Sequence, residues 1–396
     1  DYCTSSAAQA FEDLVSHIKA KYILLSYNNM ATKGNDRSNA KISDADIMRI
    51  LSRKGRVKVF SESYRAFSAG KSNITGNEER LFLCECYDYK QKELIQSPLN
   101  YTGGKYKLLP QILPHFPQDI DRFVDLFCGG GNVGINVPCN RVIFNDNNEL
   151  LRYMFGTFKN LDKQVTFETI DAIIEKYGLS NTEKYGYDFY GCNSAEGLAA
   201  YNSSRYLKLR DDFNHHTNLE YNYYVTLYVL IVYAFNNQIR FNRKGEFNLP
   251  VGKRDFNKKM REKLSTFIDR LKSGDYSFAS HDFRELPTDD WNESTFVYAD
   301  PPYLITCATY NEQDGWNETL EKELLTYLDN LNERGIRFAL SNVLHSKGKE
   351  NKILLDWIDR NVDRYRVIYL DYNYANSNYQ TKDKTSKAEE VLIVNY

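Results

Sequence analysis

The chain has 396 residues, of which 42% are hydrophobic and 26% are charged, an ordinary composition for a globular protein. Its formal net charge of −2 gives no overall attraction for nucleic acid, so such a partner would have to be recognised by local basic patches. No apolar run approaches the length of a membrane span and no signal peptide is visible, which predicts a cytoplasmic protein without a membrane partner. The seven cysteines are odd in number and scattered, which favours reduced thiols and predicts no metal site.

The N-terminal segment has the apolar spacing of a helix, a strand, a second helix and two further strands. These elements are expected at 6–20, 21–29, 43–55, 56–65 and 78–85. The same order recurs at the end of the chain, at 323–335, 336–343, 351–361, 364–374 and 388–396. Local strings correspond as well, ILLSYNN with FALSNV and EERLFLC with AEEVLIV. Since coincidence would not reproduce an ordered set, we interpret the two segments as copies of one duplicated unit.

The part of the chain between the two copies alternates apolar strands with helices, which predicts an α/β fold with a largely parallel sheet. Residues 160–237 have a helical pattern and are rich in Tyr and Asn, and 238–263 resemble a hairpin with a basic tail. The helical stretch is expected to be an insertion into the fold. The predicted division is therefore 1–93, an α/β domain formed by 94–159 and 270–396, and a mainly helical insert at 160–269.

A glycine loop follows the apolar strand FVDLF, where Gly129, Gly131 and Gly134 have the spacing GxGxxG. Missing side chains let the backbone approach a cofactor at such a loop. Asp146 follows the next strand, RVIFN, and is placed to accept hydrogen bonds from ribose hydroxyls. A dinucleotide enzyme would use the same arrangement. The two features therefore favour a nucleoside-containing cofactor without fixing which one, and a plain strand-to-helix turn is the structural alternative.

The tetrapeptide DPPY, Asp300 to Tyr303, ends the apolar strand STFVYA. Its prolines, Pro301 and Pro302, stop the strand and leave the carbonyls of Asp300 and Pro301 without partners on their own chain. A carboxylate and a rigid carbonyl can accept both N–H bonds of adenine's exocyclic amine, which favours a pyramidal nitrogen with an available lone pair. The aromatic face of Tyr303 suits a base taken out of the duplex. DPPY is therefore the strongest catalytic candidate, with a proline turn as the alternative.

A third motif, NYTGGKYKLLP, opens the unduplicated part of the chain. Gly103 and Gly104 indicate close approach of the backbone to a ligand, and Lys105 suits a carboxylate. S-adenosyl-methionine carries a methionine carboxylate, which a nicotinamide cofactor lacks. The pattern is weak alone, because a helix N-terminus explains it equally well, and it gains weight only beside the other two motifs.

These motifs together resemble the Dam-type, alpha-order adenine-N6 DNA methyltransferases over about residues 95–396. The resemblance implies a Rossmann-like methyltransferase sheet, S-adenosyl-L-methionine as cofactor and methyl transfer to N6 of adenine in double-stranded DNA. It implies that the catalytic motif is Asp300, Pro301, Pro302 and Tyr303. It implies a cofactor pocket formed by Tyr101, Gly103, Lys105, Asp125, Phe127, Gly129, Gly131, Asp146, Asp282, Phe283 and Asp300, with Asp282 and Phe283 also beside the target adenine. Because residues 160–225 depart from the family pattern, the target sequence stays open.

The segment FNNQIRFNRKGEFNLPVGK resembles the DNA-contacting β-hairpin of this family. From Ile239 to Lys263 there are nine Lys or Arg and three Asp or Glu, interleaved with aromatic residues. Such a segment can meet phosphates while polar side chains contact base edges. The residues expected to bind DNA are Asn237, Arg240, Asn242, Arg243, Lys244, Asn248, Lys253 and Arg254. For the stretch 258–263 a solvated basic face is the better interpretation.

The resemblance also gives an interpretation of residues 1–93, which contain neither a glycine loop nor a Pro-Pro motif. They are similar to the C-terminal end of a second methyltransferase of the same family. We therefore expect the chain to be the C-terminal part of a fused two-domain restriction-modification methyltransferase, working as a monomer or within that longer chain. A freestanding accessory module is the alternative. As the end of a second methyltransferase, the segment would place the strands at 21–29 and 80–85 against solvent or against the neighbouring domain, as an exposed edge.

Three other functions compete with adenine-N6 methylation. An N4-cytosine methyltransferase is disfavoured by Asp300, since those enzymes usually carry Ser at that position. A nicotinamide-dependent oxidoreductase would explain the glycine loop but not DPPY, Lys105 or the basic hairpin. A DNA-binding specificity subunit would not need a cofactor pocket.

Overall fold

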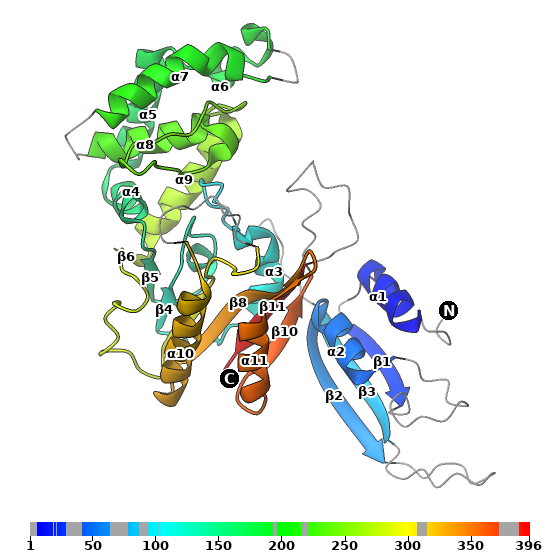
Figure 1. The fold of residues 1–396 in the computed structure, drawn as a ribbon. Helices are drawn as coiled ribbons and strands as arrows, with labels where there is room; N and C mark the ends of the chain where they lie inside the picture. Colours follow the sequence, from blue (N-terminus) through cyan, green and yellow to red (C-terminus); the bar gives the residue numbers. More distant parts are fainter. Residues whose placement is uncertain are drawn as a thin grey trace.

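A computed structural model describes the chain over residues 6–18, 20, 22–28, 42–63, 78–86, 94–101, 103–192, 196–215, 221–306, 315–371 and 388–396. The polar loops expected at 66–77 and 375–387 lie outside these ranges, as do Cys3 and Cys307. Figure 1 shows a central sheet with a helical insert and a smaller N-terminal unit at opposite ends of it.

The main sheet is eight-stranded, with the order β10-β11-β8-β7-β4-β5-β6 and β9 paired to β8 (Figure 1). Strands β8, β7, β4, β5 and β6 run parallel to one another, and β11 is antiparallel to both of its neighbours, β8 and β10. The expectation of an α/β fold with a largely parallel sheet is confirmed. The strands are β4 (Arg122–Asp125), β5 (Arg141–Asn145), β6 (Asp275–Ala279), β7 (Thr295–Ala299), β8 (Arg337–Ser346), β9 (Lys349–Glu350), β10 (Arg366–Leu370) and β11 (Glu389–Val394).

Helices cover both faces of the main sheet, which explains why its central strands are apolar on both sides. Every residue of β7 is buried, and its side chains alternate between two separate hydrophobic clusters. One cluster lies under α10 (Glu318–Glu333) and α11 (Lys352–Arg360). The helices over the other face are η2 (Lys105–Leu108), α3 (Leu109–Ile112), η3 (Leu113–His115), η4 (Gly134–Asn136), α4 (Glu149–Asn160) and α9 (Lys258–Ser273).

The insert leaves the sheet after β5 and returns at β6, the strand next to β5. Its central helix, α8, is buried from Leu227 to Tyr233 and packs against α4, α5 and α7. The helix α9 runs unbroken through residue 269, and its apolar side joins the core of the main sheet. The remaining elements are α5 (Lys163–Tyr177), α6 (Thr182–Tyr185), η5 (Asp188–Tyr190), α7 (Ala199–Asn214), α8 (Tyr221–Tyr233) and η6 (Phe235–Asn237).

The hairpin expected at 235–253 has no regular strands. It is held by two isolated antiparallel bridges, Phe241 to Phe247 and Ala234 to Val251. The two phenylalanine rings meet edge to face, 5.4 Å apart. The basic stretch at 258–263 is not a tail of the hairpin but the start of α9, because the Asn257 side chain accepts from Met260 N and caps the helix there.

The N-terminal unit, residues 6–86, is a three-stranded antiparallel sheet with two helices on one face. Its strand order is β1-β3-β2, so the strand at 78–86 is central and the expectation that it forms an edge is wrong. The unit lies beside the main sheet, with α2 next to β10 (Figure 1). Its elements are α1 (Ala7–His17), β1 (Tyr22–Asn28), α2 (Asp44–Ser52), β2 (Gly55–Ser63) and β3 (Glu78–Cys86).

Candidate active site

Three carboxyl groups lie at one edge of the main sheet. Asp125 ends β4, Asp146 follows β5, and Asp300 follows β7. Since β7, β4 and β5 are adjacent and parallel, their carboxyl ends meet at the same edge. Ligands of α/β proteins bind at this edge. The structure therefore brings the DPPY motif and the glycine loop into one site.

The glycine loop is tied to two of these carboxyl groups. Gly129 N donates to Asp146 Oδ2 (3.0 Å) and Gly134 N donates to Asp125 Oδ2 (2.9 Å). The φ angles of Gly129 and Gly131 are +47° and +75°, a region that favours glycine. A Cβ at Gly129 would lie 2.7 Å from the ring of Tyr101, so only glycine fits under that ring. The expected pocket residues Tyr101, Asp125, Gly129 and Asp146 thus lie together.

Burial makes these carboxyl groups costly to ionise. It raises the pKa of Asp125 to about 8, although the hydrogen bond from Gly134 N acts in the opposite direction. Burial also raises the pKa of Asp146, and the backbone N–H groups of Asn148 and Gly129 offset part of this effect. An acidic pocket of this kind gains free energy when a cation enters it.

Lys105 and Asp300 form a buried ion pair in the DPPY part of the site. Lys105 Nζ lies 2.8 Å from Asp300 Oδ1 and donates to Gly103 O (3.0 Å). The side chains of Lys105 and Asp300 are 4% and 17% exposed, so the pair is strongly shielded from water. Burial lowers the pKa of Lys105, but the charges of Asp300 and Glu390 outweigh it and raise that pKa above its usual value. Burial raises the pKa of Asp300, which Lys105 partly offsets.

Tyr303 packs its ring against this pair. Lys105 Nζ lies 4.7 Å from the ring centroid, and the hydroxyl of Tyr303 is 3.1 Å from Asp300 Oδ1. Of the two prolines of DPPY, Pro301 is buried and Pro302 is exposed. The expected catalytic motif is therefore held in place by contacts within the protein, and it lies beside the lysine of NYTGGK.

Glu390 belongs to the same cluster, although the sequence did not single it out. Its carboxylate lies 3.5 Å from Lys105 Nζ and 3.0 Å from the hydroxyl of Tyr303. It lies on β11, far along the chain from both partners. The only sequence signal was the pair of acids in the string AEEVLIV, which the repeat comparison used but did not interpret chemically.

A second buried carboxylate supports the aromatic side of the pocket. Phe127, which follows β4, meets Phe283 and Trp316 at ring distances of 5.7 and 5.6 Å. The indole N–H of Trp316 donates to Glu321 (2.5 Å). Glu321 also accepts from the side-chain amides of Asn342 (3.0 Å) and Asn351 (2.9 Å). Trp316 and Glu321 are further residues that sequence analysis missed.

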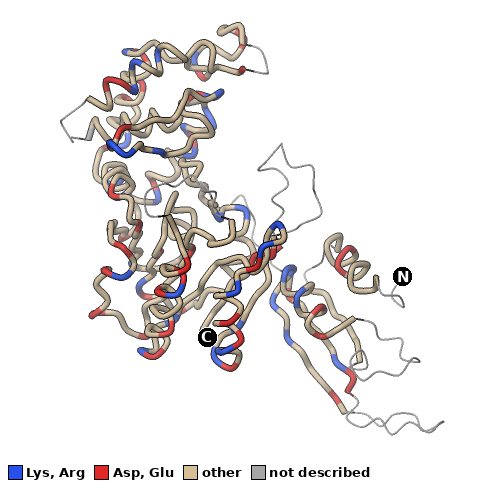
Figure 2. Tube along the Cα trace, in the orientation of Figure 1, with Lys and Arg blue, Asp and Glu red and all other residues tan. Residues whose placement is uncertain are grey.

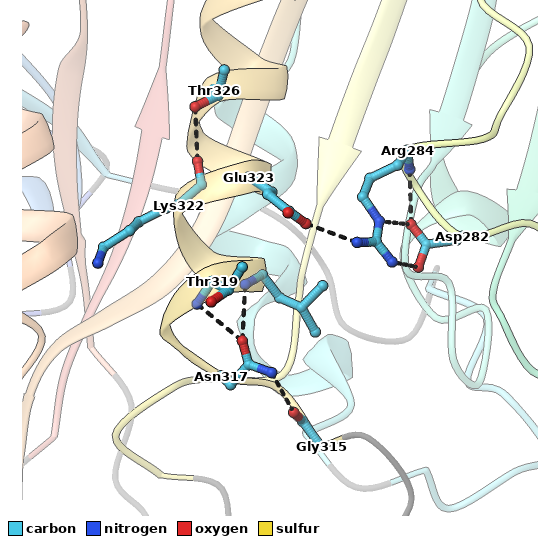
Figure 3. A network of polar contacts seen from close by, with 9 residues as sticks. Asp282, Arg284, Gly315, Asn317, Thr319, Lys322, Glu323 and Thr326 are labelled. Carbon is cyan, nitrogen blue, oxygen red and sulfur yellow. Dashed lines mark hydrogen bonds and ion pairs between the residues drawn. The ribbon is translucent and has the colours of Figure 1, made fainter.

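Asp282 is already paired within the protein (Figure 3). Both of its carboxylate oxygens accept from the Arg284 guanidinium, at 2.7 and 2.9 Å, and the hydrogen bond from Arg284 lowers the pKa of Asp282. Arg284 in turn donates to Glu323 on α10 (2.8 Å). Asn317 caps the start of the same helix by accepting from Thr319 N. Asp282 and Arg284 therefore join the segment that follows β6 to α10.

The residues expected to contact DNA fall into two groups. Arg243, Lys244, Lys253 and Arg254 are exposed, the first two at the turn of the hairpin. The other four take part in the hairpin itself: Arg240 donates to Asn248 Oδ1 (2.8 Å), Asn242 Nδ2 donates to Glu246 (2.7 Å), and Asn237 Nδ2 donates to Val232 O at the end of α8 (2.5 Å). The first group is thus the better candidate for contact with a partner.

The hairpin is anchored by residues that sequence analysis did not select. Asn214 of α7 binds both backbone groups of Phe247, accepting from N (2.8 Å) and donating to O (3.1 Å). Arg210 donates to Leu249 O (2.9 Å). Asn100, from NYTGGK, donates to Asn236 O (3.0 Å) and connects the hairpin to the pocket.

Charge and composition indicate no further site among the residues that the structure describes. Figure 2 shows both signs of charge on the insert, the main sheet and the N-terminal unit. Within the described ranges, no group of three or more His, Cys, Asp or Glu could hold a metal ion. In the same part of the chain, no helix combines the length and hydrophobicity needed to cross a bilayer.

The chain is similar to known proteins along its whole length. A family model described as D12 class N6 adenine-specific DNA methyltransferase matches residues 101–382. Modification methylase StsI of Streptococcus sanguinis is 38% identical over 426 residues, which cover 100% of this chain and 59% of that protein. Type II methyltransferase M.FokI of Planomicrobium okeanokoites is 34% identical over 422 residues, with 100% and 59% covered. Modification methylase LlaI of Lactococcus lactis subsp. lactis is 31% identical over 359 residues, with 89% and 53% covered. The chain thus spans little more than half the length of these relatives.

Proposed function

The chain belongs to the D12 class of N6 adenine-specific DNA methyltransferases, and we propose that it transfers a methyl group from S-adenosyl-L-methionine to N6 of adenine in double-stranded DNA. The observation that carries the proposal is the placement of Asp300, at the end of β7, beside the glycine loop of β4. A family described as N6 adenine-specific favours adenine over the N4-cytosine alternative and leaves no reason to retain an oxidoreductase.

The pocket residues fit the proposed cofactor in shape and in charge. A Cβ at Gly129 would lie 2.7 Å from the ring of Tyr101, so the loop presents bare backbone beside that ring. S-adenosyl-L-methionine carries a sulfonium and an ammonium against one carboxylate, so a pocket with Asp125, Asp146 and Asp300 suits its net positive charge. Asp146 would hold the ribose hydroxyls, since each of its oxygens has a second lone pair. When bound, the cofactor supplies a methyl group on an electrophilic sulfur.

The chain's own residues would align and activate the target amine. Asp300 and the carbonyl of Pro301 would accept the two N–H bonds of the amine and aim its lone pair at the methyl group. The ring of Tyr303 would cover the face of the extruded base. Rate would come from alignment and from these fixed acceptors, whose negative charge stabilises the developing ammonium. No general base is required, because the amine becomes acidic as it turns cationic and its proton can pass to water.

The DNA contacts would come from the insert. Arg243 and Lys244 at the turn of the hairpin, with Lys253 and Arg254 at its base, are exposed cations that can neutralise phosphates. The contact between Asn100 and Asn236 supports this arrangement, since it sets the hairpin beside the pocket. We propose the division into a catalytic domain at 94–159 and 270–396 and a target-recognition insert at 160–269.

The restriction-modification role rests on the relatives. Two of them are named modification methylases, and this chain covers 59% of one and 53% of the other. We propose that the chain is part of a longer modification enzyme and that residues 1–93 are the end of a preceding domain of the same kind.

Methylome sequencing of DNA from a host that expresses the chain tests the proposed function directly. The expected result is N6-methyladenine in one short sequence context, absent from DNA of the same host carrying the Asp300→Ala variant. Methylation at N4 of cytosine, or none at all in the presence of folded protein, would refute the proposal.

A further inference from the structure

Two carboxylates and two donors form a closed arrangement in the active site. Lys105 Nζ lies 2.8 Å from Asp300 Oδ1 and 3.5 Å from Glu390 Oε1. The hydroxyl of Tyr303 lies 3.1 Å and 3.0 Å from the same two oxygens. The ammonium of Lys105 can donate to both acids, whereas the hydroxyl of Tyr303, which has one proton, lies within reach of both and can donate to one of them at a time. Lys105 and Tyr303 thus contact Asp300, and Glu390 contacts the same two side chains.

Glu390 is the most deeply buried member of this arrangement. Its side chain is 0% exposed, whereas that of Asp300 is 17% exposed. Glu389, the preceding residue on β11, is 25% exposed and pairs instead with His345 (2.8 Å). A fully buried carboxylate is expensive unless its partners repay the lost hydration. Lys105 and Tyr303 are those partners, which indicates that the buried carboxylate of Glu390 holds these two side chains in place.

A comparison within the molecule shows that this strand position does not by itself bury an acid. Glu79 on β3 occupies the register position that Glu390 occupies on β11, two residues before Leu81 and Leu392 respectively. Glu79 is exposed and accepts from the hydroxyl of Ser26 (2.9 Å). An acid can therefore sit at this position on the surface, and it is the catalytic cluster that buries Glu390.

We propose that Glu390 is a positioning residue for methyl transfer: it fixes Lys105 and Tyr303, which hold Oδ1 of Asp300 and so present Oδ2 to the target amine. The inference rests on the proposed function, since it assigns Asp300 the amine. Glu390 also shares the positive charge of Lys105. Without that sharing the ammonium would act on Asp300 alone and weaken it as an acceptor.

The charge of Glu390 has a consequence for pH dependence. It raises the pKa of Asp300 and the pKa of Lys105. Removing it must therefore lower both, so Asp300 stays ionised to lower pH and Lys105 loses its proton at lower pH. The other titratable groups near the cluster are Tyr298 of β7 and Asp125 of β4, which the substitution leaves in place.

The test compares Glu390→Gln with Glu389→Gln, a matched change on the same strand outside the cluster. Glutamine keeps one oxygen as an acceptor for Tyr303, removes the charge and replaces the second oxygen by an amide NH2 group of similar size. For E390Q we expect kcat to fall about tenfold or more, while KM for DNA and the affinity for S-adenosyl-homocysteine change by less than about threefold. Both limbs of the pH profile of kcat should move to lower pH. E389Q should match the wild type in all these measurements.

A second readout does not depend on methylation. Nitrogen NMR of the Lys105 ammonium, assigned with a Lys105→Met variant, gives its pKa directly in wild type and in E390Q. A fall of this pKa in E390Q, with circular dichroism unchanged, supports the bridged arrangement even if the chain methylates nothing, in which case only the proposed function fails. A wild type that methylates, combined with an E390Q variant whose pH profile and lysine pKa equal those of E389Q, would overturn the inference.

Discussion

The N-terminal unit and the C-terminal edge of the main sheet share their strand arrangement. In each, the last strand lies between the other two, as β1-β3-β2 and as β8-β11-β10. The register agrees as well: Ser26 of β1 pairs with Leu81 of β3, and Ser341 of β8 pairs with Leu392 of β11. The two regions differ in what lies against them rather than in how they are built.

One face of the shared arrangement is covered in the main sheet and open in the N-terminal unit. Phe60 and Leu81 are 54% and 37% exposed, and their register equivalents Ile368 and Leu392 are 4% and 0% exposed. In the main sheet this face packs into the cluster that contains α3, the helix following NYTGGK. The strands thus form the same framework in both regions, and the candidate site is formed in the main sheet by the segments that pack on them.

The largest expected effect is on methyl transfer, which we assign to the main sheet and not to the N-terminal unit. Asp300→Ala removes the acceptor for the target amine and should abolish methylation while DNA affinity in a gel-shift assay stays close to wild type. The loss should exceed about tenfold in turnover, or ~1.4 kcal/mol of transition-state stabilisation. A variant that keeps more than about a tenth of wild-type turnover would remove Asp300 from its role.

The next largest difference is expected in the free energy of unfolding, between substitutions at two equivalent positions that differ in burial. Leu392→Ala, at a fully buried site, should lower the free energy of unfolding by about 2–5 kcal/mol. Leu81→Ala, at the open site, should lower it by about 1 kcal/mol or less. Urea unfolding followed by circular dichroism measures both. Equal costs for the two variants would mean that the face of the N-terminal unit is covered in solution.

The glycine loop has no counterpart in the N-terminal unit, and its carboxylate can be tested by cofactor binding. Asp146→Ala should weaken binding of S-adenosyl-L-methionine by about 1.5–3 kcal/mol, the range for hydrogen bonds that involve a charged group. Isothermal titration calorimetry measures the change, with Glu79→Ala as a control in the repeated unit. Unchanged affinity for the Asp146 variant would place the cofactor elsewhere.

The hairpin of the insert has no equivalent among the described residues of the N-terminal unit. If Arg243 or Lys244 contacts a base edge, its replacement by Ala should relax the preference at one position of the target site, at a cost of about 1–3 kcal/mol. Competition binding with single-base variants of the site measures this preference. A uniform loss of affinity for all sequences would show that the two side chains contact phosphate only.

The smallest effect on catalysis is expected from removal of residues 1–93. A chain that starts near Ser97 should keep cofactor binding and its turnover, because the described site residues lie outside the deleted segment. It should also be more soluble, since the open face of the N-terminal unit exposes apolar side chains. A shorter chain that is unfolded by circular dichroism, or folded but inactive, would make the N-terminal unit an integral part of the enzyme.

Sequence patterns predicted the parts of the site that follow strands, because strand ends are local features. DPPY, the glycine loop and Asp146 each come directly after an apolar run, and they meet because those strands are neighbours. Glu390 was not predicted, since its partners lie far away in the sequence and an acid in an apolar strand has no diagnostic spacing. Glu321 was not predicted either, since it is one of several acids of the helix α10 and its partners Asn342 and Asn351 lie further along the chain. For the same reason the central position of β3 in the N-terminal sheet was not predicted.

The return of the chain to β6 has a consequence for how new sequence specificities can arise. Because β5 and β6 are neighbours, the insert begins and ends at adjacent strands of the sheet. Lengthening the insert therefore adds little to the entropic cost of loop closure. The sequence of its last helix, α9, is constrained by packing. The ring of Phe267 lies 5.5 Å from that of Phe155, centroid to centroid, and it is next to the position that a Cβ at Gly131 would occupy. Exchange of the insert between relatives should therefore preserve cofactor binding when the boundary precedes α9, and impair it when α9 is exchanged as well. A modification enzyme built this way can acquire a new target site without redesign of its catalytic core.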